Sequence, residues 1–251
     1  MQALETAEDF DTLISSIGTN PDIQALYLSA NALPTIYLPT CFLNLRCLEL
    51  ANCGLVSLPD DFGSNCPNLR VLNLNFNALK DLRPLLNVRR LGELHVAGNR
   101  LNRLRKNAAV LSMLNGLTKV DLRGNPFGIG FFAPVNENRL TITRKPESMN
   151  EFEEVDEAAE ERGAFELPPI DKDVDQKYQE LLDEDTKLRR RVYEMLLANS
   201  CRGLKVLDGL HFNRKEMLVR DEIWHRLVEL GVLRKSSKVE DSVVGSLQNQ
   251  D

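Results

Sequence analysis

The sequence has few of the residues on which catalysis and metal binding depend. Only three of its 251 residues are histidines, and one is a tryptophan. His95, His211 and His225 are far apart in the chain and form no HxxxH or HExxH pattern. No glycine-rich phosphate loop, GxSxG segment or Cys/His pair with a known catalytic spacing is found either. We therefore expect no enzymatic activity, no metal ion and no cofactor.

Long hydrophobic runs and paired cysteines are also lacking. No apolar segment approaches the length of a membrane span, and the start MQALETAEDF has neither the basic nor the apolar region of a secretory signal. The five cysteines are odd in number and include no CxxC pair. These features predict a soluble intracellular protein with reduced thiols. The formal net charge of -6 argues against general nucleic-acid binding.

What the chain does contain is an eleven-residue phrase that occurs five times. Leucine or a similar residue stands at positions one, four, six and eleven, and Asn or Cys at position nine. The phrases begin at Ile23, Leu45, Leu69, Leu91 and Leu117, with 22, 24, 22 and 26 residues between starts. This spacing is typical of leucine-rich repeats, whose coils stack into a curved parallel sheet. We predict an α/β leucine-rich-repeat solenoid of the 22-residue type, with a degenerate sixth turn at Leu204 and Leu207.

The ninth position of each phrase is expected to be structural. A buried amide there can satisfy backbone groups of the turn and of the neighbouring coil, and a cysteine is the usual small substitute. The residues concerned are Asn31, Cys53, Asn77, Asn99 and Asn125. We assign none of them to a ligand.

Both ends of the stack should carry caps, because an open end exposes apolar surface and strand edges. The sequence predicts an N-terminal helical cap in 1–20, five repeats in 21–130, an acidic, proline-containing insertion in 131–177, a C-terminal cap with the degenerate repeat and helices in 178–234, and a disordered tail in 235–251. Within the C-terminal cap we expect one helix from Tyr178 to Ala198. Its apolar residues are Leu181, Leu182, Leu188, Val192, Tyr193, Leu196 and Leu197.

A further helix should follow Asn213, which is a suitable N-cap, and end at Gly231. Trp224 lies close to the apolar stripe of that segment. We expect the indole to pack in the core rather than to bind a ligand.

The insertion allows more than one interpretation. Its prolines and its many glutamates favour a solvated loop. Six basic residues near the fourth repeat have the opposite charge: Arg89, Arg90, Arg100, Arg103, Arg105 and Lys106. The insertion could dock on this basic cluster, or the cluster could hold a phosphorylated segment of a partner, because guanidinium groups bind phosphate in a bidentate manner. A solvated edge of the solenoid is the third alternative.

A capped solenoid without catalytic residues offers its concave surface for binding, so candidate site residues are those that face away from the core. The candidates are Tyr27, Arg46, Glu49, Arg70, Asn73, Phe76, Glu93, His95, Asp121 and Arg123. The outward residues between the two central leucines form a polar strip. Phe76 is a candidate anchor for a partner if it is exposed.

Several linked segments carry a resemblance to a known family. They are VDLRGNPFGIGFFAP after the fifth repeat, KYQELLDEDTKLRRRVYEMLLANSC before the degenerate repeat, and IWHRLVELGVLRK after it. Together with the repeats they resemble the C-terminal leucine-rich-repeat domain of the fungal spindle-pole-body scaffolds that serve the septation initiation and mitotic exit networks, which are related to animal centriolin. The family contributes no catalytic residue that could be transferred to this chain.

The resemblance implies a protein-docking module in the cytoplasm and cytoskeleton, at the spindle pole body. Expected partners are a coiled-coil anchor protein and kinase or GTPase-regulator subunits of the network, with no small molecule, membrane or direct nucleic-acid contact. Two alternatives use the same class of repeat and of C-terminal cap. One is a targeting subunit of a type-one protein phosphatase, and the other is a leucine-rich-repeat subunit of a ribonucleoprotein complex.

Overall fold

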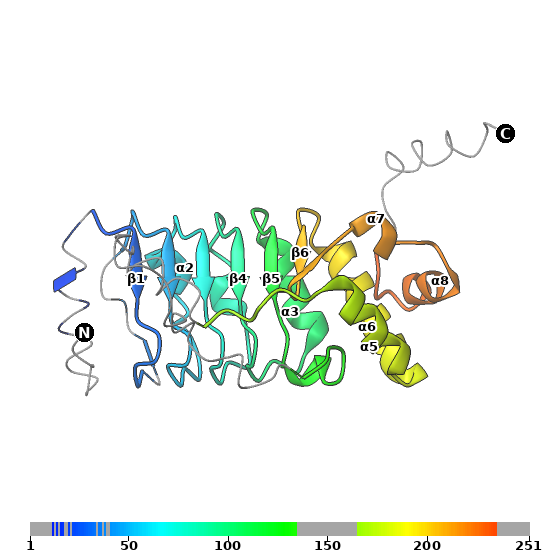
Figure 1. The fold of residues 1–251 in the computed structure, drawn as a ribbon. Helices are drawn as coiled ribbons and strands as arrows, with labels where there is room; N and C mark the ends of the chain where they lie inside the picture. The colour runs from blue at the N-terminus through cyan, green and yellow to red at the C-terminus, as the bar shows by residue number, and fades with distance from the viewer. Residues whose placement is uncertain are drawn as a thin grey trace, which may run out of the picture.

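The fold is a single row of stacked coils (Figure 1). The computed structural model describes residues 12, 14, 16, 17, 20, 22–33, 35, 36, 38, 41–134 and 165–234. The strands are β1 (Ala25–Tyr27), β2 (Cys47–Glu49), β3 (Val71–Asn73), β4 (Glu93–His95), β5 (Lys119–Asp121), β6 (Val206–Leu207) and β7 (Leu210–His211). The helices are α2 (Phe62–Asn65), α3 (Leu104–Met113), α5 (Lys172–Leu181), α6 (Glu184–Ser200), α7 (Arg214–Met217) and α8 (Glu222–Glu229), with 3-10 turns η1 (Arg83–Leu85) and η2 (Pro126–Gly128).

The strands form one seven-stranded sheet in chain order, parallel from β1 to β6. The central leucine of each phrase pairs with its counterpart in the next coil, so Leu26, Leu48, Leu72, Leu94, Val120 and Leu207 form one buried row. The degenerate sixth turn thus adds a strand in register. β7 returns antiparallel to β6 and ends the sheet. The predicted leucine-rich-repeat solenoid is confirmed.

The core lies on one side of the sheet, between the strands and the segments that return behind them. α3 lies behind the strands in Figure 1. We call the opposite surface of the sheet the concave face, as in the prediction. Leucines of the repeat phrases are almost fully buried, and Tyr193, Phe62 and Phe131 are among the largest completely buried side chains. Because each coil contacts mainly its neighbours, the core is continuous along the row.

The residues at position nine form a ladder of hydrogen bonds between coils. The Asn77 amide donates to the carbonyls of Leu50 and Leu74 at 2.8 and 3.0 Å, and its oxygen accepts from the backbone N–H groups of Cys53 and Leu55. One and two coils further on, Asn99 and Asn125 likewise donate to two carbonyls each, and each accepts from one backbone N–H, that of Leu79 or Leu101. The Cys53 thiol donates to Leu28 O at 3.1 Å. The predicted structural role of this position is confirmed.

Position eight of every phrase has a left-handed backbone, which turns the chain out of the strand. The residues are Ala30, Asn52, Phe76, Gly98 and Gly124, with φ between 53° and 69°. Phe76 is half-buried rather than exposed. A Cβ added at Gly98 would lie 2.7 Å from Phe76 Cδ1, so the ring packs directly against this glycine. The phenylalanine therefore fills the turn region beside the next coil.

The N-terminal cap falls mostly outside the described residues. Thr12, Ile14, Ser16 and Ile17 are helical, and Ile14 is fully buried in the core cluster. The remaining residues of the predicted helix and the tail after residue 234 lie outside the described part of the chain, so the cap as a whole and the disordered tail stay predictions.

The helix predicted from Tyr178 to Ala198 is wrong in its extent. α5 begins at Lys172 and ends at Leu181, and α6 begins at Glu184. The break occurs because the Asp183 side chain accepts a hydrogen bond from the Thr186 N–H and so caps a new helix. Of the apolar residues in the predicted helix, Tyr193, Leu196 and Leu197 are buried, whereas Leu181 is 83% exposed and Leu188 is also exposed.

The last helical segment also divides into two helices. Asn213 caps α7 as predicted, because its side chain accepts from the Lys215 N–H. A second cap at Asp221 then starts α8. Gly231 has φ +64° directly after α8, as expected for a residue that ends a helix. Trp224 is buried in the core cluster, so its predicted packing role is confirmed.

The five cysteines all have free thiols. Burial raises the pKa of Cys53 to about 11 and the pKa values of Cys66 and Cys201 to about 12, which makes these thiols unreactive at neutral pH. Within the described ranges, no helix combines the length and the apolar composition that a membrane crossing requires.

Candidate protein-binding surface on the concave face

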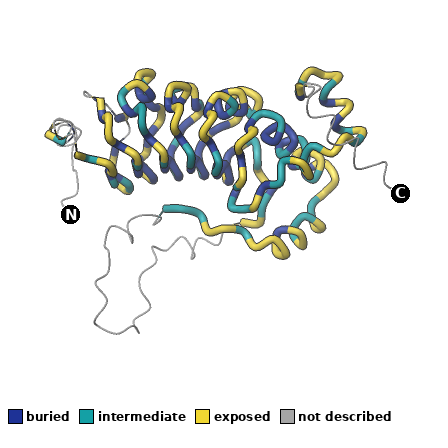
Figure 2. The backbone as a smooth tube through the Cα atoms, turned by 90° about the horizontal axis from the view of Figure 1, so that it is seen from above, coloured by how far each residue is buried: buried dark blue, intermediate teal, exposed yellow. Residues whose placement is uncertain are grey.

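An extended segment of the chain itself lies across the concave face. Residues 165–170, which we call the strap, run in front of the strands in Figure 1, from the start of α5 toward β3. Figure 2 shows the strap beside the buried row of strands, seen from above. Its sequence is Phe-Glu-Leu-Pro-Pro-Ile. Two consecutive prolines favour an extended backbone, and Asp171 then caps α5 by accepting from the Asp173 and Val174 N–H groups.

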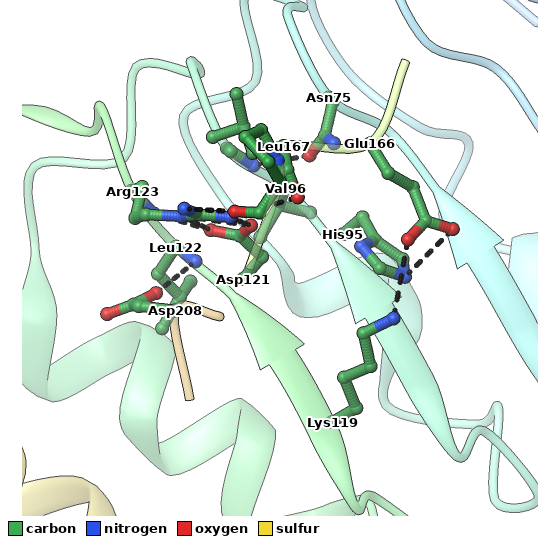
Figure 3. Close-up of polar contacts among 12 residues, drawn as sticks. Asn75, His95, Val96, Lys119, Asp121, Leu122, Arg123, Glu166, Leu167 and Asp208 are labelled. Carbon is green, nitrogen blue, oxygen red and sulfur yellow. Dashed lines mark hydrogen bonds and ion pairs between the residues drawn. The ribbon is translucent and has the colours of Figure 1, made fainter. Parts of the chain in front are cut away.

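Arg123 holds the middle of the strap. Its guanidinium donates to Leu167 O at 3.3 Å and to Pro168 O at 2.9 Å. The Asp121 carboxylate accepts from the Arg123 Nε–H and from the terminal nitrogen, which fixes the orientation of the guanidinium (Figure 3). Both side chains are about 95% buried. The pair therefore presents a fixed fork of donors to two successive carbonyl groups.

Hydrogen bonds to the strap's own backbone groups hold it at both ends. The Asn75 side chain donates to Phe165 O at 2.8 Å, while its oxygen accepts from the Ala97 N–H. At the other end, the Ile170 N–H donates to Gly209 O at 3.2 Å. The sheet face thus contacts the strap mainly through its main chain, which demands little of the strap's sequence.

One side chain of the strap enters a charged cluster. Glu166 points toward His95 and Lys119 in Figure 3, with Lys119 Nζ 3.3 Å from Glu166 Oε2 and His95 Nε2 3.7 Å from Glu166 Oε1. Lys119 Nζ also lies 3.4 Å from Glu93 Oε2. His95 and Lys119 together hold the pKa of Glu93 down at about 2, against the opposing effect of its partial burial. The pKa of Lys119 is raised, because Glu166 and Glu93 outweigh its partial desolvation.

Glu49 lies at the edge of this cluster and carries an unfavourable charge. Burial raises its pKa from 4.5 to about 7, and the nearby Glu166 adds to the effect, while Asn73 and His95 partly oppose it. The folded state therefore binds a proton at Glu49 more tightly than the unfolded chain does. Stability contributed by this group is lost as the pH rises from about 4.5 to about 7.

We predict that Glu49→Gln stabilises the protein at alkaline pH, because glutamine has a similar shape and no charge. The gain in the free energy of unfolding should be about 2 kcal/mol larger at pH 8 than at pH 5, given ~1.4 kcal/mol per pKa unit. Urea unfolding of both proteins at the two pH values measures this difference. An equal gain at pH 5 and pH 8 would contradict the assigned role of the Glu49 charge.

A buried network supports Arg123 from the core side. Asp208 accepts from the Leu122 N–H at 2.7 Å and from the Tyr193 hydroxyl at 2.5 Å. Burial, and then the nearby Asp121, raise the pKa of Asp208 to about 7. Burial and Asp208 also raise the pKa of Tyr193 well above its usual value. These contacts join β5 to α6 and to the sixth coil, and so fix the strand that carries Asp121 and Arg123.

The predicted site residues divide into two groups. Glu49, Asn73, His95, Asp121 and Arg123 were expected to face solvent, yet each is at least 95% buried. Their exposure was wrongly predicted, at least partly because the strap lies over the same face. Tyr27, Phe76 and Glu93 are half-buried, and Arg46 and Arg70 are exposed. The latter two lie side by side, because the Arg70 N–H donates to Arg46 O at 2.8 Å.

The structure tests the interpretations of the insertion only in its last part. Residues 135–164, which carry the acidic run, lie outside the described residues, so docking of that run on the basic cluster stays a prediction. For residues 165–177 the solvated loop is wrong, because these residues form the strap and most of α5. The strap contacts the concave face and not the basic cluster. All six basic residues are exposed, but they do not form one patch. Arg89 and Arg90 precede β4, whereas Arg100, Arg103, Arg105 and Lys106 follow it, so the two groups lie at opposite ends of that strand.

Sequence reasoning missed the strap. The repeat pattern places Asn75 and Lys119, which hold it, at outward positions of their phrases, but neither was included among the candidate site residues. The Leu-Pro-Pro sequence signals an extended segment but does not specify where it docks. Within the described residues, no group of three or more His, Cys, Asp or Glu side chains is arranged to hold a metal ion.

Comparisons with known proteins agree with this architecture. A family model described as leucine rich repeat matches residues 43–101. The septation initiation network scaffold protein cdc11 of Schizosaccharomyces pombe is 28% identical to this chain over 191 residues, which is 75% of the chain and 18% of that protein. The chain therefore spans less than a fifth of the length of this relative. This match confirms the resemblance to fungal septation-network scaffolds that was inferred from the sequence.

Proposed function

We propose that this chain is a non-catalytic protein-interaction domain that docks components of a septation initiation or mitotic exit network at the spindle pole body. The observation that carries the proposal is the similarity to a septation initiation network scaffold over three quarters of the chain. A leucine-rich-repeat solenoid whose strands present polar side chains on the face away from the core supports a docking role. Neither the phosphatase-targeting nor the ribonucleoprotein alternative is favoured by a specific observation.

The part of the concave face that the strap does not cover is the natural place for first contact with a partner. Arg46 and Arg70 are exposed and adjacent at the starts of β2 and β3, and Ala25 is exposed on β1. Their guanidinium groups make no ion pair with any residue that the structure describes, and they would attract an acidic surface and raise the rate of association. The proposed partners are a coiled-coil anchor protein and kinase or GTPase-regulator subunits of the network.

We predict that Arg46→Glu together with Arg70→Glu reduces capture of the partner at least tenfold and leaves the melting temperature unchanged. Tagged wild-type and variant chains are purified from dividing fungal cells, and the copurifying proteins are quantified by mass spectrometry. Arg202→Glu with Lys215→Glu is the matched control, because it makes the same charge change at exposed positions of the C-terminal cap.

Spindle-pole or network proteins that are lost in the Arg46 and Arg70 variant, but kept in the control, would support the proposal. Capture of phosphatase catalytic subunits or splicing proteins instead would overturn the assignment to the network. Equal capture by all three chains would remove Arg46 and Arg70 from the binding surface.

A further inference from the structure

The strap contacts the solenoid as a bound peptide would, and not as another coil. None of its apolar side chains belongs to the core cluster or to the residues packed against it. Pro168 and Pro169 are exposed, and Phe165, Leu167 and Ile170 are half-buried. The surface beneath the strap is polar, so water can solvate it when the strap is absent. Removal of the strap would therefore leave the core of the repeats intact.

The groove under the strap recognises the backbone of an extended chain. Asn75 and Arg123 donate hydrogen bonds to three of its carbonyl groups, those of Phe165, Leu167 and Pro168. Asp121 already holds the Arg123 guanidinium in place, so little ordering is needed when an extended chain binds. Backbone recognition of this kind accepts any extended segment that presents its carbonyl groups at the same spacing.

Specificity comes from a carboxylate and from the prolines. Lys119 and His95 face the position of the Glu166 carboxylate, so an acidic side chain is preferred at that point. Two positions further on, proline keeps the backbone extended and has no N–H group that would remain unpaired. The groove thus fits an extended peptide with an acidic residue, an apolar residue and then proline.

The strap leaves part of the groove unsatisfied. Among the described residues, Asn73 Nδ2 and His95 Nε2 are buried polar atoms that make no hydrogen bond of normal length, because Glu166 Oε1 of the strap stays 3.7 Å from His95 Nε2. They belong to adjacent strands, because Asn73 and His95 are paired in the β3–β4 register. A ligand that places an oxygen or a water molecule between them would make contacts that the strap does not make.

We propose that the groove formed by Asn75, His95, Lys119 and Arg123 is a binding site for an extended acidic, proline-containing segment of a partner protein, and that the strap is an internal occupant which this segment replaces. The inference rests on the proposed docking function and adds the class of ligand. Because the strap is tethered to the same chain, it competes at a high effective concentration and lowers the apparent affinity for the partner.

The test measures the affinity of a fluorescein-labelled peptide, GAFELPPIDK, for the full chain by fluorescence anisotropy. A strap variant with Glu166→Ala, Pro168→Gly and Pro169→Gly weakens the internal competitor without altering the groove. We expect the peptide to bind this variant at least tenfold more tightly than the wild-type chain. If the melting temperature of this variant falls by more than about ten degrees, Glu166→Ala alone replaces it, with a smaller expected gain.

A charge exchange locates the peptide in the groove. Adding Lys119→Glu to the strap variant should abolish binding of GAFELPPIDK, and the exchanged peptide GAFKLPPIDK should bind this chain instead. Lys215→Glu in the same background is the matched control and should change neither affinity.

The proposal is overturned if neither chain binds the peptide, because the strap would then be a fixed part of the fold. It is also overturned if the strap variant and the wild-type chain bind equally, or if Lys119→Glu has no effect. No network protein takes part in this measurement, so its result is independent of whether spindle-pole proteins copurify with the chain.

Discussion

Asn77→Ala should lower the free energy of unfolding by about 3 to 5 kcal/mol, which is a large part of the stability of a domain of this kind. The amide of Asn77 serves two carbonyl groups and two backbone N–H groups that lie between the second and third coils. Alanine leaves Leu50 O and the N–H groups of Cys53 and Leu55 buried and unpaired, while Leu74 O keeps the hydrogen bond that it accepts from Asn99. Water cannot replace the amide, because the surrounding leucines are almost completely buried.

Urea unfolding followed by circular dichroism measures this loss. The matched control is Asn102→Ala, which removes the same amide from an exposed position two residues before α3 and should change the free energy of unfolding by less than about 0.5 kcal/mol. Equal effects of the two substitutions would show that the ladder at position nine does not hold the coils together.

Arg190→Met should lower the free energy of unfolding by about 3 to 5 kcal/mol, because it removes one partner of a buried ion pair. The Arg190 guanidinium donates to both oxygens of Asp175 and to Phe131 O, and it also contacts Glu194. Without it the Asp175 carboxylate of α5 stays buried beside α6 with no cationic partner. α5 follows the strap directly, so this pair also anchors the strap's C-terminal end.

The neighbouring Arg189→Met provides the comparison. Arg189 pairs with Asp185 at 3.1 Å and donates to Thr186 Oγ1, but its side chain is 46% exposed and that of Asp185 is 80% exposed, so solvent screens the ion pair. Arg189→Met should lower the free energy of unfolding by less than about 1 kcal/mol, measured by the same urea titration. If Arg190→Met and Arg189→Met lowered the free energy of unfolding by the same small amount, the buried ion pair would stabilise the fold no more than an exposed pair.

The sequence was sufficient to predict features that repeat along the chain. Leucines at fixed positions require each coil to bury them against the next, and position nine must satisfy the turn, so the sheet and the ladder of Asn77 and its equivalents follow from the pattern. The structural role of Cys53 followed for the same reason. The sixth strand at Val206–Leu207 was predictable because its leucines retain the spacing.

Features that occur once could not be predicted in this way. The breaks between α5 and α6 and between α7 and α8 depend on single capping aspartates, Asp183 and Asp221, inside segments whose apolar periodicity continues. Docking of the strap depends on contacts of residues 165–170 with parts of the repeats that are 45 to 90 residues away in the chain. Docking of the strap helps to bury the polar strip, which the repeat pattern alone would leave exposed to solvent.

We expect partners of this domain to bind its concave face. Photo-cross-linking in dividing fungal cells tests it most directly, with a benzophenone amino acid placed at Ala25 on the concave side of β1 or at Met113 on the end of α3 behind the sheet. Both positions are exposed. We predict adducts with spindle-pole or network proteins at Ala25 and none at Met113. Adducts at Met113 and none at Ala25 would contradict the claim.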